Sequence, residues 1–179
     1  MGAINPVRQS LFFSATLNGR EEALVKANSK PNLVKVTVKM RDTATTVDQD
    51  VVKVAPDKAK IEVLHDILVS QGVTKTLIFA RTKWGCEKLA IELKNRGFKA
   101  DSIHGNKTQY QRQRVLAGFK LDRLSVLVAT DVAARGLDIP DVSHVINYEI
   151  PDNYEDYIHR IGRTGRANKG GKALTFIGA

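Results

Sequence analysis

Short apolar runs alternate with longer helical patterns from Val47 onward, and this alternation constrains the fold more than any other feature of the sequence. In 57–70, for example, Ile61, Leu64 and Leu68 form a helical stripe. Strands that alternate with helices in this way predict right-handed crossovers and a parallel sheet. We therefore expect an α/β fold in which a parallel sheet is the middle of three layers, flanked by helices. The expected strands are 51–54, 76–80, 99–103, 125–129, 142–148 and 172–177.

The residues before Val47 do not follow this pattern. The segment 9–15 contains the apolar run Leu11-Phe12-Phe13, which is typical of a buried strand, and 18–28 is expected to be a helix. A polar, Lys-rich stretch with Pro31 follows and resembles a tether. We expect 1–46 to be a separate piece and 47–179 to be the α/β domain.

Composition narrows the class of protein without identifying it. The chain is 42% hydrophobic and carries a formal charge of +9, which favours polyanions, although basic segments are equally often plain solvated faces. Cys86 is the single cysteine, which excludes a disulfide framework, and its apolar neighbours predict a buried thiol rather than a nucleophile. No apolar run has the length of a membrane span and no signal peptide is visible. We expect a soluble cytoplasmic or otherwise intracellular protein with no membrane partner.

Polar residues follow several of the expected strands directly. In parallel sheets ligands bind beyond the carboxyl ends of the strands, so the segments 81–83, 104–105 and 130–138 are candidate site segments. The last of these places Thr130, two aspartates, an arginine and Gly136 at one strand end, which suits phosphate and sugar groups. A short helix with Asp131 near its start, ending in an exit turn, is the alternative interpretation.

A row of arginines lies near the end of the sequence. Arg160, Arg163 and Arg166 recur every third residue and are interleaved with Gly162 and Gly165. Guanidinium groups stay protonated and present a fork of donors that matches phosphate, so the row is suited to an anion. We expect Arg160 to end a helix, with the other two arginines on the turn and loop that follow, because glycine weakens a helix.

Two motifs needed for nucleotide binding are not found in this sequence. No G-x-x-x-x-G-K-[ST] phosphate loop occurs, since Gly171-Lys172 is followed by Ala173. No Asp-Glu pair follows an apolar strand to hold magnesium and activate water. The chain thus carries groups that stabilise a transferring phosphate but none that bind a nucleotide alone, which is what half of an active site would contain.

Taken together, these stretches resemble the DEAD-box family of ATP-dependent RNA helicases, in helicase superfamily 2. The similarity covers nearly the whole chain, and the string HRIGRTGR is its most specific part. The family's fold implies that 47–179 is a second RecA-like (P-loop NTPase-like) domain, the helicase C-terminal domain, and that 1–46 is the tail of a first one plus the linker. The matching stretches are 14–16 for motif III, 77–83 for motif IV, 109–112 for the Gln-x-x-Arg element, 128–140 for motif V and 159–166 for motif VI.

The resemblance implies a role for each motif. Arg163 and Arg166 would be catalytic arginine fingers on the γ-phosphate of ATP, and we expect both to be exposed and mobile here because no phosphate meets them within this sequence. Asp138 would hold the ribose, with Gly136 also at the ATP site. His159 and Arg160, with Ser14 and Thr16, would couple the state of ATP to closure of the two domains. The residues implied to lie along RNA are Thr82, Lys83, Gly105, Gln109, Arg112, Thr130 and Gly136.

The same resemblance implies that this sequence is a fragment of a larger enzyme. ATP and Mg²⁺ would be bound mainly by the missing first domain, so we expect no ATP hydrolysis by the fragment alone and no metal site in it. The implied partners are RNA and that first domain. The expected strand in 9–15 would lack its own sheet and be disordered or pair with an exposed edge of another molecule. A DNA-directed superfamily 2 motor and a non-catalytic RNA-binding module remain as alternatives.

Overall fold

The structure is a computed structural model, and it describes residues 5, 7–14, 19–37, 47–137, 139–165 and 170–178. The chain divides into two compact units, 1–40 and 41–179.

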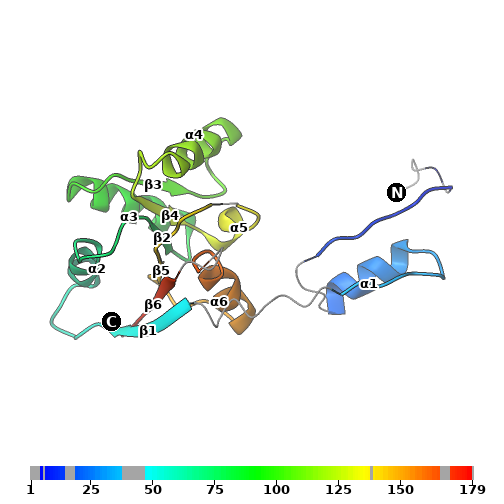
Figure 1. Ribbon diagram of the computed structural model, residues 1–179, viewed down its shortest axis with the longest axis horizontal. Helices are drawn as coiled ribbons and strands as arrows, with labels where there is room; N and C mark the ends of the chain where they lie inside the picture. Colours follow the sequence, from blue (N-terminus) through cyan, green and yellow to red (C-terminus); the bar gives the residue numbers. More distant parts are fainter. Residues whose placement is uncertain are drawn as a thin grey trace. The chain divides into compact units, whose positions relative to one another are not determined.

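A parallel sheet forms the centre of the second unit. The six strands found among the described residues pair in the order β1-β6-β5-β2-β4-β3, and every pair is parallel (Figure 1). Their bounds are Val47–Lys53 (β1), Thr76–Phe79 (β2), Ala100–Ile103 (β3), Val126–Ala129 (β4), His144–Asn147 (β5) and Gly171–Ile177 (β6). All six predicted strands of the α/β domain are confirmed. The edge strand β1 begins earlier than its apolar residues predicted, because Val47 to Lys53 pair in register with β6.

Helices cover both faces of the sheet, which confirms the three-layer prediction. α2 and α3 pack on one face, whereas α4, α5 and α6 contribute buried residues to the other. The bounds are Lys60–Leu68 (α2), Lys83–Asn95 (α3), Gln109–Lys120 (α4), Asp131–Ala134 (α5) and Tyr154–Ile161 (α6). The last of these ends directly after Arg160, as predicted, with Gly162 at its C-cap.

The core follows from the alternation of side chains along each strand. In β2, Leu77 and Phe79 pack with α4 and α5, whereas Ile78 packs with α2 and α3. Both faces of a strand are therefore apolar, which explains the unbroken hydrophobic runs in the sequence. Cys86 belongs to this core: it is fully buried, its Sγ lies 3.1 Å from the carbonyl oxygen of Val128, and burial raises the pKa of its thiol to about 12. The prediction of a core thiol is confirmed.

The register brings the ends of four strands to one edge. Phe79 is level with Ala129 of β4 and with Asn147 of β5, and Ala129 is level with Ile103 of β3. The next residues, including His104 and Thr130, therefore emerge at the same carboxyl edge. Three helix caps also lie there: Thr82 and Thr108 accept backbone hydrogen bonds at the starts of α3 and α4, and Asn153 does so for α6.

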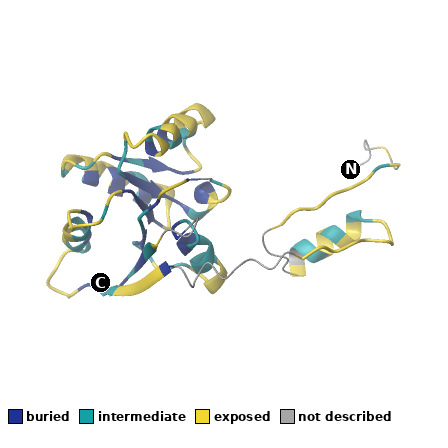
Figure 2. Cartoon of the chain, in the orientation of Figure 1, coloured by how far each residue is buried: buried dark blue, intermediate teal, exposed yellow. Residues whose placement is uncertain are grey.

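The first unit contains α1 (Gly19–Asn28), and none of its described residues is buried (Figure 2). The helix predicted there is confirmed. The described residues 9–14 belong to no helix or strand, so the apolar run does not pack as an interior strand of its own unit, and its pairing with another molecule stays a prediction. Leu11 and Phe13 are 68% and 91% exposed. An apolar run forms a strand only when a neighbouring strand takes up its backbone hydrogen bonds, and the described part of this unit contains no such neighbour.

Candidate functional site: the carboxyl edge of the sheet

A buried arginine joins two helices at this edge. Arg160 of α6 is 3% exposed and binds Asp131 of α5 with both prongs of its fork, Nε to Oδ1 at 2.6 Å and Nη2 to Oδ2 at 2.8 Å. Its Nη1 donates to Asn147 Oδ1 (3.2 Å) and to the carbonyl of Glu149 (2.8 Å), and its guanidinium lies 5.0 Å from the centre of the Phe79 ring. These contacts are all within the α/β domain, so Arg160 fixes α5 against α6 and β5.

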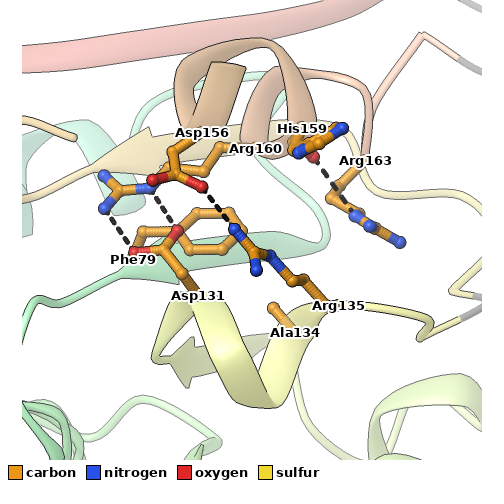
Figure 3. A pocket seen from close by; sticks show the side chains of 8 residues that line it. All are labelled: Phe79, Asp131, Ala134, Arg135, Asp156, His159, Arg160 and Arg163. Atoms are coloured by element: carbon orange, nitrogen blue, oxygen red, sulfur yellow. Dashed lines mark hydrogen bonds and ion pairs between the residues drawn. The ribbon is translucent and has the colours of Figure 1, made fainter. Parts of the chain in front are cut away.

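A second ion pair lies beside the first. Arg135 Nη2 is 2.7 Å from Asp156 Oδ1, and Asp156 is held in turn by Asn153 at the start of α6. Figure 3 shows the two arginine–aspartate pairs side by side, next to the Phe79 ring. The small pocket that they form is lined by Phe79, Asp131, Ala134, Arg135, Asp156, His159, Arg160 and Arg163.

The predicted finger Arg163 lines this pocket beside His159 (Figure 3). It is half-buried, and its Nη1 donates to the carbonyl of Leu137 at 2.8 Å while Nε lies 3.3 Å from the carbonyl of His159. The expectation of an exposed Arg163 is therefore wrong, because two carbonyl oxygens hold the guanidinium in place of an anion. Asp138 and Arg166 lie outside the described residues.

His159 lines the same pocket with one nitrogen unsatisfied. Its ring is half-buried on α6, and Nδ1 is buried without a hydrogen-bond partner among the described residues. A buried polar atom without a partner is costly, so such an atom marks a place where a further group is expected to bind. Of the two first-unit residues predicted to couple with it, Ser14 is exposed and Thr16 lies outside the described residues.

The residues predicted to lie along RNA occupy the neighbouring part of the edge, over β2, β3 and β4. Thr82 caps α3, and Lys83 begins it. The Lys83 side chain covers Gly105: its Cε lies 3.2 Å from where a Cβ on that glycine would be. Gln109 begins α4, so the first turns of α3 and α4 flank this glycine turn. Neither first turn contains an acidic residue, in contrast to those of α5 and α6.

Three further predicted residues differ in how they are held. The Nε atom of Arg112 is buried and has no partner in the described part of the chain. Thr130 is 7% exposed at the start of α5 and makes no side-chain capping bond. Gly136 adopts φ +73°, a left-handed conformation that favours glycine, so the turn after α5 requires it. Arg112 thus presents a buried donor that a ligand could satisfy.

A polar cluster of side chains from α3, β3 and the following turn adjoins Gly105. Glu87 Oε2 accepts from Ser102 Oγ, lies 2.9 Å from His104 Nε2 and 3.4 Å from Lys107 Nζ. Asn106 N–H donates to His104 Nδ1 (3.3 Å), which leaves the ring proton on Nε2, facing the carboxylate. Burial opposes ionisation of Glu87, but the hydrogen bonds from Ser102 and His104 and the charge of Lys107 outweigh it and lower its pKa to about 2.

The sequence pattern did not identify several members of these clusters. Asp156, Asn147, Phe79 and Glu87 are far along the chain from their partners, and no short motif joins them. Asn147 gave the one usable signal, since an amide inside a buried strand requires a partner.

Metal-binding and membrane-spanning features were also sought in the described residues. They contain no group of three or more His, Cys, Asp or Glu side chains able to hold a metal ion. None of the helices in this part of the chain combines the length and apolar character needed to cross a membrane.

Comparison with known proteins identifies the family. The family described as "Helicase conserved C-terminal domain" matches residues 59–168. ATP-dependent RNA helicase CshA of Listeria monocytogenes is 46% identical over 95% of this chain and 32% of its own length. Pre-mRNA-splicing ATP-dependent RNA helicase PRP28 of Pyricularia oryzae is 43% identical over 96% of this chain and 26% of its own length. The chain therefore spans about a third or less of these relatives.

The fold has close counterparts among solved structures. Dbp5 of S. cerevisiae bound to RNA and ADP BeF3 superposes with a TM-score of 0.76 at 31% identity, covering 93% of this chain and 44% of that one. The structural neighbours contain RecA-like DEAD-box C-terminal domains, which confirms the expected fold class. The chain belongs to the helicase conserved C-terminal domain family, in its DEAD-box branch.

Proposed function

We propose that this chain is the C-terminal part of an ATP-dependent RNA helicase, which couples ATP binding and hydrolysis to unwinding or remodelling of RNA duplexes. It supplies arginine fingers and part of the RNA-binding surface, while a first RecA-like domain outside this sequence binds most of the nucleotide and its Mg²⁺. Residues 1–46 are the end of that first domain and the linker. The names of the relatives, all ATP-dependent RNA helicases, support the proposal.

The hydrogen bond from Arg163 Nη1 to the carbonyl of Leu137 carries the nucleotide half of the proposal. It holds the guanidinium beside the residue that precedes Asp138, which we assign to the ribose together with the Gly136 turn. A γ-phosphate brought in by the first domain would replace this carbonyl as acceptor. Phosphate oxygens accept charge-assisted hydrogen bonds, which are roughly twice as strong as neutral ones, so the exchange favours the closed state.

Arg163 and Arg166 then act on the transition state of phosphoryl transfer. Negative charge spreads over the transferring group as its bond to the leaving oxygen breaks, and a positioned guanidinium stabilises that charge without reorganisation. The protein's own contribution is placement: the Arg160–Asp131 pair sets the end of α6, and the turn that follows α6 carries Arg163.

The RNA half of the proposal rests on the unsatisfied donors of the same edge. Arg112 Nε and the first turns of α3 and α4 offer N–H groups and positive charge to phosphates, contacts that position a strand without reading its sequence. The assigned residues are Thr82, Lys83, Gly105, Gln109, Arg112, Thr130 and Gly136.

Coupling between the two ligands is assigned to His159 and Arg160, acting with Ser14 and Thr16. The unsatisfied Nδ1 of His159 is the group that we expect to meet the first domain on closure. Arg160 contributes indirectly, because its donors are engaged inside the α/β domain.

The decisive experiment uses the full-length protein. Replacing Arg166 or Arg163 with Ala should lower RNA-stimulated ATP turnover by about 10³- to 10⁵-fold, as expected for arginine fingers, with a much smaller change in ATP affinity. A modest loss of turnover would instead assign these arginines a structural role.

Three further measurements separate the alternatives. The purified 179-residue chain should release no phosphate from ATP with RNA present. Phosphate release would contradict the proposal that hydrolysis requires the first RecA-like domain. RNA and DNA of one sequence, compared as activators of the full-length enzyme, distinguish an RNA helicase from a DNA-directed motor. A phosphate loop and an Asp-Glu-Ala-Asp box encoded upstream would exclude the non-catalytic module.

The exposed Leu11 and Phe13 also support self-association through residues 9–15, by pairing with a sheet edge of a second molecule. Light scattering across a range of protein concentrations tests this, with Leu11→Lys as the variant expected to remain monomeric.

A further inference from the structure

Two large aromatic side chains are exposed on the helices that flank the Gly105 turn. Trp84 on α3 is 75% exposed and Tyr110 on α4 is 74% exposed, and each is the second residue of its helix. Single exposed aromatic residues are ordinary on protein surfaces. The argument therefore depends on their position and on the charges around them.

Trp84 lies next to the path that we assign to the RNA backbone. The preceding residue, Lys83, packs its side chain over Gly105, so the first turn of α3 and the glycine turn are in contact. Side chains on a helix lean toward its N-terminus, which at α3 is the carboxyl edge of the sheet. The buried side of α3 is formed by Cys86, Leu89, Ala90 and Leu93, and Trp84 points away from it.

The surroundings of Trp84 are polar rather than apolar, and the carboxylate of Glu87, one turn further along α3, is already engaged in the cluster around His104. Lys88, one turn further along α3, places its ammonium 5.5 Å from the centre of the indole ring. The first turn contains no acidic residue, and the N-cap is Thr82. An apolar protein partner would require a wider hydrophobic patch than one ring among lysines. A flat ring beside cations suits a nucleobase, whose π-face stacks on indole while its phosphate meets the positive charge.

We propose that Trp84 is a base-stacking residue that binds one unpaired base of single-stranded RNA where the strand passes α3. Tyr110 offers a second ring of the same kind at the start of α4. The proposal rests on the assignment of this edge to RNA and adds a contact to a base, whereas the residues assigned above bind only the sugar-phosphate backbone.

Trp84 is the only tryptophan in the chain, so intrinsic fluorescence of the 179-residue chain reports on this ring directly. We would titrate it with an end-labelled single-stranded RNA and with an oligonucleotide of the same backbone that lacks bases. Label anisotropy measures binding, and tryptophan fluorescence measures stacking. We expect RNA to quench the fluorescence, and the abasic strand to bind roughly tenfold more weakly without quenching.

Substitutions at Trp84 test the stacking contact directly. Trp84→Ala should weaken RNA binding by roughly tenfold, whereas Trp84→Phe should retain most of the affinity because it keeps a ring. Tyr154→Ala is the matched control: Tyr154 is also 74% exposed in the first turn of a helix, but that turn is acidic, and we expect unchanged binding. Both altered side chains are exposed, so the fold should persist.

The outcomes separate this inference from the proposed function. RNA that binds without quenching, or that binds Trp84→Ala and the original chain equally, would overturn base stacking and leave backbone binding intact. If no RNA bound by anisotropy at any concentration tested, the assignment of this edge to RNA would fail, and the stacking contact with it.

Discussion

The carboxyl edge of the sheet has two halves that satisfy their arginines in opposite ways. In the part of the edge that carries α5 and α6, which we call the paired half, Arg160 and Arg135 each bind an aspartate, at 2.6 Å and 2.7 Å. In the part that carries the Gly105 turn and the first turns of α3 and α4, the open half, Arg112 keeps a buried Nε without a partner in the described residues. The first turns of α3 and α4 likewise lack the acidic residues that begin α5 and α6.

This difference indicates that the two halves of the edge have different functions. A buried guanidinium with its own carboxylate keeps its place whether or not a ligand is present, so the paired half fixes the helix that leads to Arg163. A donor without an internal partner has a high free energy until a ligand accepts its hydrogen bond, so the open half is suited to bind a polyanion. Stability measurements should therefore respond to the paired half and ligand-binding measurements to the open half.

The largest effect is expected for Arg160→Ala in the paired half. The substitution leaves Asp131 with an unpaired charge and removes donors from Asn147 and the Glu149 carbonyl. Breaking a buried pair in this way costs about 3–5 kcal/mol of the free energy of unfolding. Urea denaturation of the chain, followed by circular dichroism, measures the change.

Arg160→Lys is the informative control for that prediction. A lysine keeps the charge but cannot form the two-pronged contact with Asp131, so we expect it to recover only part of the loss. If the lysine variant were as stable as the original chain, charge alone would explain the paired half and the geometry of the fork would be irrelevant.

The second effect concerns the open half. Arg112→Ala removes a cation that we assign to a phosphate, so RNA binding should weaken by about 2 kcal/mol, the usual size of a charged hydrogen bond. The slope of log affinity against log salt concentration should decrease in magnitude by about one, as expected for the loss of one phosphate contact. The free energy of unfolding should change much less, because the guanidinium Nε has no internal partner to lose. A stability loss equal to that of Arg160→Ala would abolish the distinction between the halves.

A third, smaller effect tests the polar cluster around His104, which adjoins the Gly105 turn of the open half. The folded-state pKa of Glu87 is about 2, below the ordinary value of 4.5, so its contribution is complete above pH 4.5 and is lost as pH falls toward 2. The side chain is 43% exposed, and solvent screening limits the contribution to about 1 kcal/mol. We expect the stability difference between the original chain and Glu87→Gln to shrink by roughly half or more from pH 5 to pH 3.

Glu92→Gln on the same helix is the control for the pH experiment. Glu92 makes a single ion pair with Arg96 at 3.6 Å and takes no part in the cluster around His104. A pH dependence as large as that of Glu87→Gln would mean that the whole helix surface, rather than this cluster, responds to acid.

Most of the fold was predictable because it depends on local patterns. The strands β2 and β4 are buried at every residue and apolar at all but Thr76, and Thr82, Thr108 and Asn153 signal the helix starts. The apolar run Leu11 to Phe13 forms no strand among the described residues for a physical reason: apolar composition favours a strand, but only a neighbouring strand supplies its hydrogen bonds.

The site was predictable to the extent that its residues follow strands directly or lie in one contiguous motif. The contacts that hold them were not, since Arg160 meets Asp131 across 29 positions and His104 meets Glu87 across 17. Such pairs depend on which helices the topology places side by side. The same limit applies to Arg163, whose carbonyl partner at Leu137 turned an expected exposed finger into a half-buried one.

The smallest effect is expected for Arg135→Ala, although this arginine lies in the same pocket as Arg160 and also binds an aspartate. The Arg135 side chain is 60% exposed, so water competes for its guanidinium and the pair should contribute less than about 1 kcal/mol to the free energy of unfolding. Asp156 keeps the hydrogen bond that Asn153 Nδ2 donates to its Oδ2 when the arginine is removed, so its carboxylate retains a partner. Urea denaturation should therefore separate two ion pairs of nearly equal length by several kcal/mol. Equal losses would show that membership of the pocket, rather than burial of the guanidinium, determines what each pair contributes.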